Sequence, residues 1–231
     1  MRPRSVEVLV DEQIRRWEYL RTHPIKGTPS PPPPAVVVVS RELGAGGSSV
    51  ARLVADALEF RLWDRDIVHA IAEKSGVREA LLASLDEHAR GMLGGVVATL
   101  RGADEAITAY AQRLAEVVRT IAHHGSAVIV GRGAQFLVDP HHALRVHVIA
   151  PRDVRVERTA QRRGISLEQA EREVALSDRA RKKFLKQHFG EDGGEPLHYD
   201  VIVNTVAVSI EAAAAGIIAA YRARRPPHTE V

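Results

Sequence analysis

Residues 36–50 constrain the fold of this chain more than any other stretch, because an apolar run changes there abruptly into glycines. The four consecutive valines at 36–39 are β-branched and uncharged, which predicts a strand buried in a sheet. Glycines and serines then fill most of residues 44–49, and a helical pattern with apolar residues on one face begins at Val50. The stretch therefore predicts a strand, a tight glycine-rich turn and a helix.

A turn of this kind is suited to binding phosphate. Glycines let the backbone curl so that its N–H groups point at an anion, and the positive end of the helix dipole adds to the attraction. The usual motif, G-x-x-x-x-G-K-[ST], is not matched, because Gly47 stands at the lysine position when Gly46 is taken as the second glycine. On these residues alone, a phosphate-binding loop and a plain tight connection are both open.

Composition narrows the class of protein. The 231 residues are 45% hydrophobic, enough for one α/β domain with a sizeable core. The absence of cysteine excludes disulfides, thiolate nucleophiles and cysteine metal sites. No apolar run reaches the roughly 18 residues of a membrane span, and the first residues lack the apolar core of a secretion signal, so we expect a cytoplasmic protein without a membrane partner.

Charge and aromatic content bear on the partner. The formal net charge is +3 and aromatic residues make up 4% of the chain. Both values are low for a nucleic-acid binder, which typically carries a strong basic excess and stacking aromatics. A mild positive excess does suit an anionic small molecule, so we expect a small-molecule ligand and no nucleic acid.

The order of apolar runs and helical patterns predicts an α/β fold. Apolar runs at 36–39, 60–63, 127–130, 144–150 and 200–204 alternate with helical patterns, and this predicts a parallel β-sheet flanked by helices on both faces. Ligands of such folds bind at the carboxyl ends of the strands. Polar or glycine residues follow four of these runs, which places the candidate site at that edge.

Four segments together resemble the cytidylate kinase-like family, relatives of bacterial cytidylate kinases among the nucleoside monophosphate kinases. They are SRELGAGG at 40–47, WDRD at 63–66, VGRG at 130–133 and YDVIVNT at 199–205, and the resemblance covers about residues 35–222. The family commonly has S-R-E-x-G-S-G-G at the loop, so the missing lysine is itself similar to the family. The resemblance implies a P-loop kinase-like fold and phosphoryl transfer that depends on ATP and Mg²⁺, with CMP or dCMP as the first acceptor to consider.

The resemblance also divides the chain. Residues 35–225 are expected to form the P-loop kinase-like domain, with a helical insertion at about 66–124 and a lid at about 164–195; 226–231 is a tail. Residues 1–34 lie outside the resemblance and read as a helix at 6–22 followed by a proline-rich linker. The apolar stripe of that helical appendage needs a docking surface on its own domain or on a second copy, which would make a homodimer.

Donor-site roles follow from the resemblance. The loop residues that would wrap the phosphates of ATP are Gly44, Ala45, Gly46, Gly47, Ser48 and Ser49. Ser48 would offer the hydroxyl nearest to Mg²⁺, and Arg41 would supply the cation that lysine usually gives. Asn204, after the last strand, is a candidate for the edge of the adenine pocket, with a plain turn as the alternative.

The acceptor and lid residues carry similar alternatives. Arg132 would grip the acceptor's phosphate with its planar guanidinium, although it is also consistent with an exposed arginine beside a turn. Gly133 departs from the G-R-D of related cytidylate kinases. Asp64 and Asp66 would contact the acceptor or its magnesium shell, and Asp64 is equally suited to cap a helix.

The charged run at 177–183 is similar to the arginine-bearing lid of these kinases. Asp178 would then bind substrate, and Arg179 and Arg181 would close over the phosphates, exclude water and strengthen the field on the transferring group. A solvated helix face is the alternative. Two other functions also stay open: a catalytically silent nucleotide-binding module and a kinase for a non-nucleotide acceptor.

Overall fold

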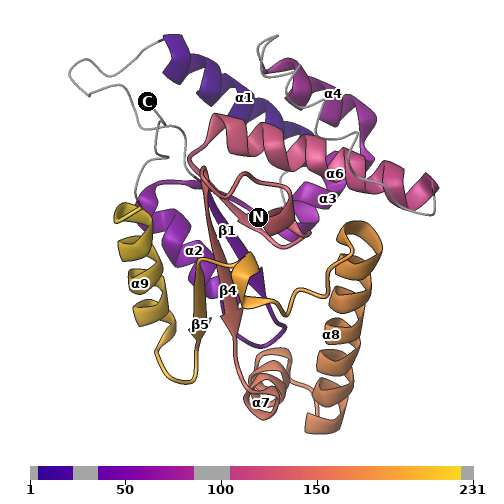
Figure 1. Cartoon of the computed structure of the whole chain (residues 1–231), viewed down its shortest axis with the longest axis vertical. Helices are drawn as coiled ribbons and strands as arrows, with labels where there is room; N and C mark the ends of the chain where they lie inside the picture. Colours follow the sequence, from indigo (N-terminus) through magenta and orange to yellow (C-terminus); the bar gives the residue numbers. More distant parts are fainter. Residues whose placement is uncertain (1–4, 23–35, 86–104, 225–231) are drawn as a thin grey trace.

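The computed structural model describes residues 5–22, 36–85 and 105–224 (Figure 1). The residues expected to form the linker and the tail, and part of the expected helical insertion, lie outside these ranges. The elements in chain order are α1 (Val6–Thr22), β1 (Val36–Arg41), α2 (Gly47–Leu58), β2 (Arg61–Trp63), α3 (Arg65–Glu73), α4 (Ser75–Ala83), α6 (Glu105–His124), β3 (Ala127–Val130), η1 (Ala134–Phe136), β4 (Ala143–Ile149), α7 (Arg152–Arg163), α8 (Leu167–Phe189), η2 (Pro196–His198), β5 (Val201–Asn204) and α9 (Ile210–Arg222).

The strands form one parallel sheet in the order β2-β3-β1-β4-β5, with the valine strand β1 at its centre. Val38 pairs with Ile129 of β3 on one side and with Arg145 of β4 on the other. The α/β fold with a parallel sheet and helices on both faces is thus confirmed. The central position explains why β1 begins with four consecutive valines: both of its faces are covered, so no polar side chain alternates with them.

The four valines divide two hydrophobic layers between them. Val36 and Val38 belong to a core cluster shared with α1, α3, α4 and α6. Val37 and Val39 belong to a second cluster, on the opposite face, shared with α2 and α9. Successive side chains of a strand point to opposite faces, so one run of valines anchors helices on both sides of the sheet.

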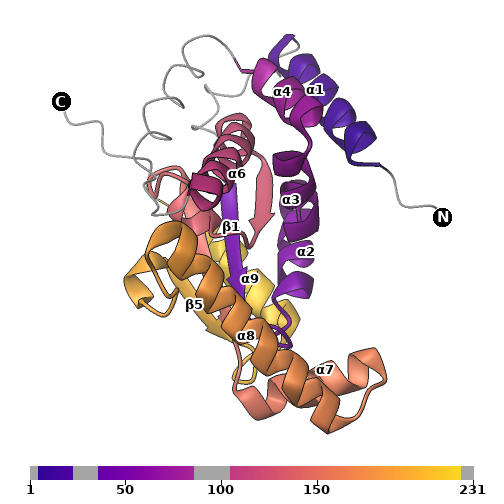
Figure 2. The same cartoon turned by 90° about the vertical axis from the view of Figure 1, so that its right-hand side faces the viewer.

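Helix α1 packs on this chain's own domain (Figures 1 and 2). Val10 and Trp17 are buried in the cluster that holds Val36. The Trp17 ring stacks on His124 of α6 at 3.8 Å between centroids and lies 6.2 Å from Trp63 of β2. Of the two docking surfaces that the sequence left open for this helix, the structure places it against its own domain.

Helices α7 and α8 lie at the carboxyl end of the sheet. Strand β4 ends at Ile149, and α7 begins directly after Pro151. A capping box, in which Ser166 and Gln169 satisfy each other's backbone N–H groups, starts α8. This long helix then runs back beside the strand ends (Figure 2), and its Glu173 and Arg181 line the cavity at the edge where ligands of parallel sheets bind.

Trp17→Ala tests whether α1 is part of the core. Replacing a buried tryptophan removes its contacts with Trp63 and His124, and we expect the free energy of unfolding to fall by about 3 kcal/mol. Chemical denaturation followed by circular dichroism measures this. Val8→Ala, an exposed apolar position on the same helix, is the matched control and should change stability by less than about 0.5 kcal/mol. Equal effects of the two variants would contradict the packing of α1.

Candidate nucleotide site

A cavity of about 700 Å³ opens at the carboxyl ends of β1 and β3, between the glycine loop and α8. Its charged lining is dominated by arginine, against two glutamates, Glu42 and Glu173. The arginines come from five different segments of the chain and are Arg41, Arg65, Arg132, Arg162, Arg163 and Arg181. Such a concentration of guanidinium groups is suited to an anionic ligand.

The glycine loop offers backbone rather than side chains to this cavity. Gly44 and Gly46 have φ values of 85° and 79°, in the left-handed region that glycine adopts without strain. Gly46 caps α2 without a side-chain hydrogen bond, and the first N–H groups of a helix have no partner within it. These donors and the helix dipole are therefore available to an anion.

The loop residues named from the sequence lie together, though not all face the cavity. Gly44, Gly46, Gly47 and Ser48 line it. Ala45 is buried, and its carbonyl accepts a hydrogen bond of 2.9 Å from the Thr205 hydroxyl. Ser48 and Ser49 are both exposed on the first turn of α2, and of the two only Ser48 lines the cavity.

Arg41 ends β1 and lies across two glycines. A Cβ at Gly47 would collide with the Arg41 Cβ, and a Cβ at Gly131 would collide with its guanidinium. Burial, and then the positive charges of Arg65 and Arg132, lower the pKa of Arg41 to about 10. Arg41 is still protonated at neutral pH.

Arg132 follows β3 and projects into the same cavity. Its φ is 57° between two glycines that are also left-handed. Its guanidinium lies 5.7 Å from the centroid of the Phe184 ring of α8, a cation–π arrangement, and its Nε donates to the Arg65 carbonyl at 3.4 Å. Burial lowers the pKa of Arg132, as it does for Arg41.

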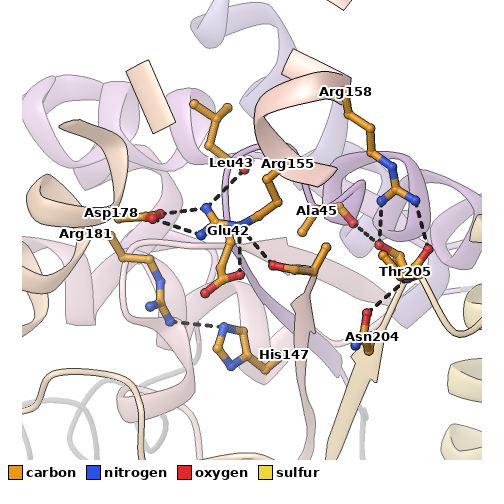
Figure 3. A network of polar contacts seen from close by, with 12 residues as sticks. Glu42, Leu43, Ala45, His147, Arg155, Arg158, Asp178, Arg181, Asn204 and Thr205 are labelled. Carbon is orange, nitrogen blue, oxygen red and sulfur yellow. Dashed lines mark hydrogen bonds and ion pairs between the residues drawn. The ribbon is translucent and has the colours of Figure 1, made fainter. Parts of the chain in front are cut away.

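Arg181 reaches the cavity from α8 and is held by hydroxyl groups. Its Nη2 donates to the Ser40 hydroxyl at 3.0 Å and to the Tyr199 hydroxyl at 3.2 Å, and the latter in turn donates to the Gly193 carbonyl at 3.0 Å. The buried imidazole of His147 lies 3.4 Å from Arg181 (Figure 3). Burial, and then the charge of Arg181, lower the pKa of His147 to about 4, so His147 is neutral at pH 7 and adds no repulsion.

The other residues named from the sequence lie at the margin of the cavity or in local structure. Asp64 caps α3 by accepting from two backbone N–H groups at 2.9 Å, and Asp66 is exposed and pairs with Arg65. Asn204 accepts from the N–H of Val206 in a turn. Arg179 is exposed on α8. Contacts of these side chains with a ligand stay predictions.

Asp178 does not face the cavity in this arrangement. Both of its carboxylate oxygens accept hydrogen bonds of 3.0 Å from Arg155 of α7 (Figure 3). Arg155 was missed by the sequence reasoning, because α7 carries five arginines and only one of them, Arg155, is buried. The one signal was its spacing of four from Thr159, which shares its buried face.

Two further searches of the described residues bear on ligands. Within 5–22, 36–85 and 105–224, His, Asp and Glu do not gather in groups of three that would hold a metal ion. Among the same residues, every helix is too short or too polar to cross a membrane.

Comparisons with known proteins show what this chain is similar to. A cytidylate kinase from Staphylothermus marinus is 26% identical over 179 residues, which cover 76% of this chain and 90% of that protein. A cytidylate kinase from Ignicoccus hospitalis is 28% identical over 178 residues, covering 77% and 93%. The fold is similar to the crystal structure of an uncharacterized protein from Eubacterium ventriosum, with a TM-score of 0.62 and 19% identity over 82% of this chain and 99% of that one.

The family model with the description cytidylate kinase-like family matches residues 36–207. This range begins at the valine strand and includes the glycine loop, both arginine-bearing strand ends and α8. The chain belongs to the cytidylate kinase-like family.

Proposed function

We propose that this protein transfers the γ-phosphoryl group of ATP to a nucleoside monophosphate, with CMP or dCMP as the first acceptor. One observation carries the proposal: six arginines surround a loop of bare backbone in a single cavity. Phosphoryl transfer demands mainly positioning and neutralisation of charge, and these groups provide both. The two archaeal relatives are named as cytidylate kinases, which supports the choice of acceptor.

The donor side fits the triphosphate of ATP, which supplies the phosphoryl group. The N–H groups at the start of α2 would bind its oxygens, and Arg41 would take the place of lysine beside them. A lysine at 47 has no room, because Arg41 fills the space where its side chain would begin. Arg41 is thus the cation that the packing of this loop permits.

Magnesium would bind chiefly through the nucleotide. The nearest carboxylates are engaged, Glu42 with Arg155 at 3.3 Å and Glu173 with Arg163. Ser48 lines the cavity and carries its hydroxyl group on the first turn of α2. Mg²⁺ characteristically keeps water and phosphate oxygens as most of its ligands, so one serine is a sufficient protein contribution.

The acceptor would lie toward α8. Arg132 would hold its phosphate, with Phe184 supporting the guanidinium from behind, and Arg181 would face the transferring group from the opposite wall. A volume of about 700 Å³ is in the range of sites for small ligands. A catalytically silent nucleotide-binding module is the second candidate, favoured by the absence of a lysine in the loop; a kinase for a non-nucleotide acceptor would use the same donor site.

An acceptor screen separates these functions. With ATP and Mg²⁺, we expect ADP to form fastest with CMP or dCMP and at least about 10-fold more slowly with UMP or AMP, because the site would stabilise the transition state of one acceptor preferentially. Measurable binding of ATP without turnover of any acceptor would select the silent module. Turnover with a sugar or another hydroxyl compound alone would select the non-nucleotide kinase.

Arg41→Ala tests the substitute cation. Removing one preorganised positive group from the transferring phosphoryl should lower kcat by at least about 100-fold, measured by coupled ADP release, while Arg41→Lys should retain more activity than Arg41→Ala. Arg172→Ala, an exposed arginine of α8 that pairs with Glu168, is the matched control and should keep wild-type rates. Near-normal turnover by Arg41→Ala would refute the role.

A further inference from the structure

Helix α7 lies between the glycine loop and α8, and one of its arginines is buried against both. Arg155 is 5% exposed. Besides contacting the loop and α8, its Nε donates to the Ala150 carbonyl at 3.0 Å, where β4 leads into α7. A guanidinium held on three sides in this way is fixed in position, and it fixes the groups that it contacts.

On one side Arg155 holds the glycine loop. Its Nη1 donates to the Leu43 carbonyl at 3.4 Å, and its Nε lies 3.3 Å from a Glu42 carboxylate oxygen. A Cβ at Gly44 would collide with the backbone of Arg155. The loop therefore rests directly on the main chain of α7 and is tied to the same residue by its side chain (Figure 3).

On the other side Arg155 holds α8. Its two terminal nitrogens each donate to one oxygen of Asp178 at 3.0 Å, the bidentate geometry that fixes orientation as well as distance. Asp178 lies three residues before Arg181, on neighbouring turns of one face of α8. The placement of Arg181 in the cavity is thus linked through Asp178 and Arg155 to the placement of the loop.

A second ion pair joins the same two helices but contacts neither the glycine loop nor Asp178. Arg152 of α7 and Glu171 of α8 are 3.2 Å apart, and both side chains are more than half exposed. Surface pairs of this kind contribute little, whereas a partly buried pair leaves an uncompensated charge when one partner is removed. The two pairs therefore make a matched comparison within one helix–helix contact.

We propose that Arg155 is a positioning residue that sets the glycine loop and Arg181 in register across the cavity, and that Asp178 acts through Arg155 rather than on the acceptor. The expected effect on kinetics rests on the proposed phosphoryl transfer. The geometric part, coupling of the loop to α8, holds for any ligand of the cavity.

A double-mutant cycle tests the kinetic part. We expect Asp178→Asn and Arg155→Lys each to lower kcat/KM by about 10-fold or more, and the double variant to fall within about threefold of the worse single one, because the two act as one unit. Each variant should also weaken binding of a non-hydrolysable ATP analogue measured without acceptor. Multiplicative losses with unchanged binding of the analogue would show that Asp178 contacts the acceptor itself, and would overturn the proposal.

Hydrogen exchange on the ligand-free protein tests the geometric part and needs no activity. In Asp178→Asn we expect faster amide exchange both at 42–48 and at 177–185, since each depends on the same guanidinium. Glu171→Gln should change neither segment and should keep wild-type kinetics. Faster exchange confined to α8 would overturn the proposal. If the wild-type protein turns over no acceptor, the proposed function fails, while exchange and analogue binding still decide whether Arg155 couples the two segments.

Discussion

Crowding of guanidinium groups around exposed backbone is the interaction on which the site depends. Burial, and then the positive charges of Arg65 and Arg132, lower the pKa of Arg41, and the loop beside these residues presents N–H donors at the start of α2. The protein has assembled more positive charge there than its own carboxylates neutralise. A polyanion entering the cavity would relieve this repulsion, and that relief would favour its binding.

The glycines of the site are explained by close packing as much as by turns. Gly47 and Gly131 leave room for the side chain of Arg41, and Gly44 lets the loop lie on α7. The ring of Phe189 occupies the space where a Cβ at position 133 would lie. An aspartate at 133, as in related cytidylate kinases, would need that ring to move. At both positions where this chain departs from a familiar motif, Gly47 and Gly133, a neighbouring side chain, Arg41 or Phe189, fills the space that a larger residue would need.

The sequence predicted the sheet, the order of its helices and the strand ends that meet at the cavity, because apolar runs and their polar ends are local patterns. Arg41 and Arg132 were identifiable since Arg41 is the last residue of β1 and Arg132 lies two residues past β3. Arg155 was not, because its burial is decided by contacts with Glu42 and Asp178, which lie 113 residues before it and 23 after it in the chain. For Asp64 the sequence allowed a helix cap, and the structure has that cap; a ligand contact there stays a prediction.

The packing of α1 has a spectroscopic consequence. The chain has two tryptophans, and both belong to one stack, in which Trp17 of α1 lies 6.2 Å from Trp63 and directly on the His124 ring. All of the indole fluorescence of the protein therefore originates at the junction of this helix with the sheet. Emission will therefore report the attachment of α1 to the sheet.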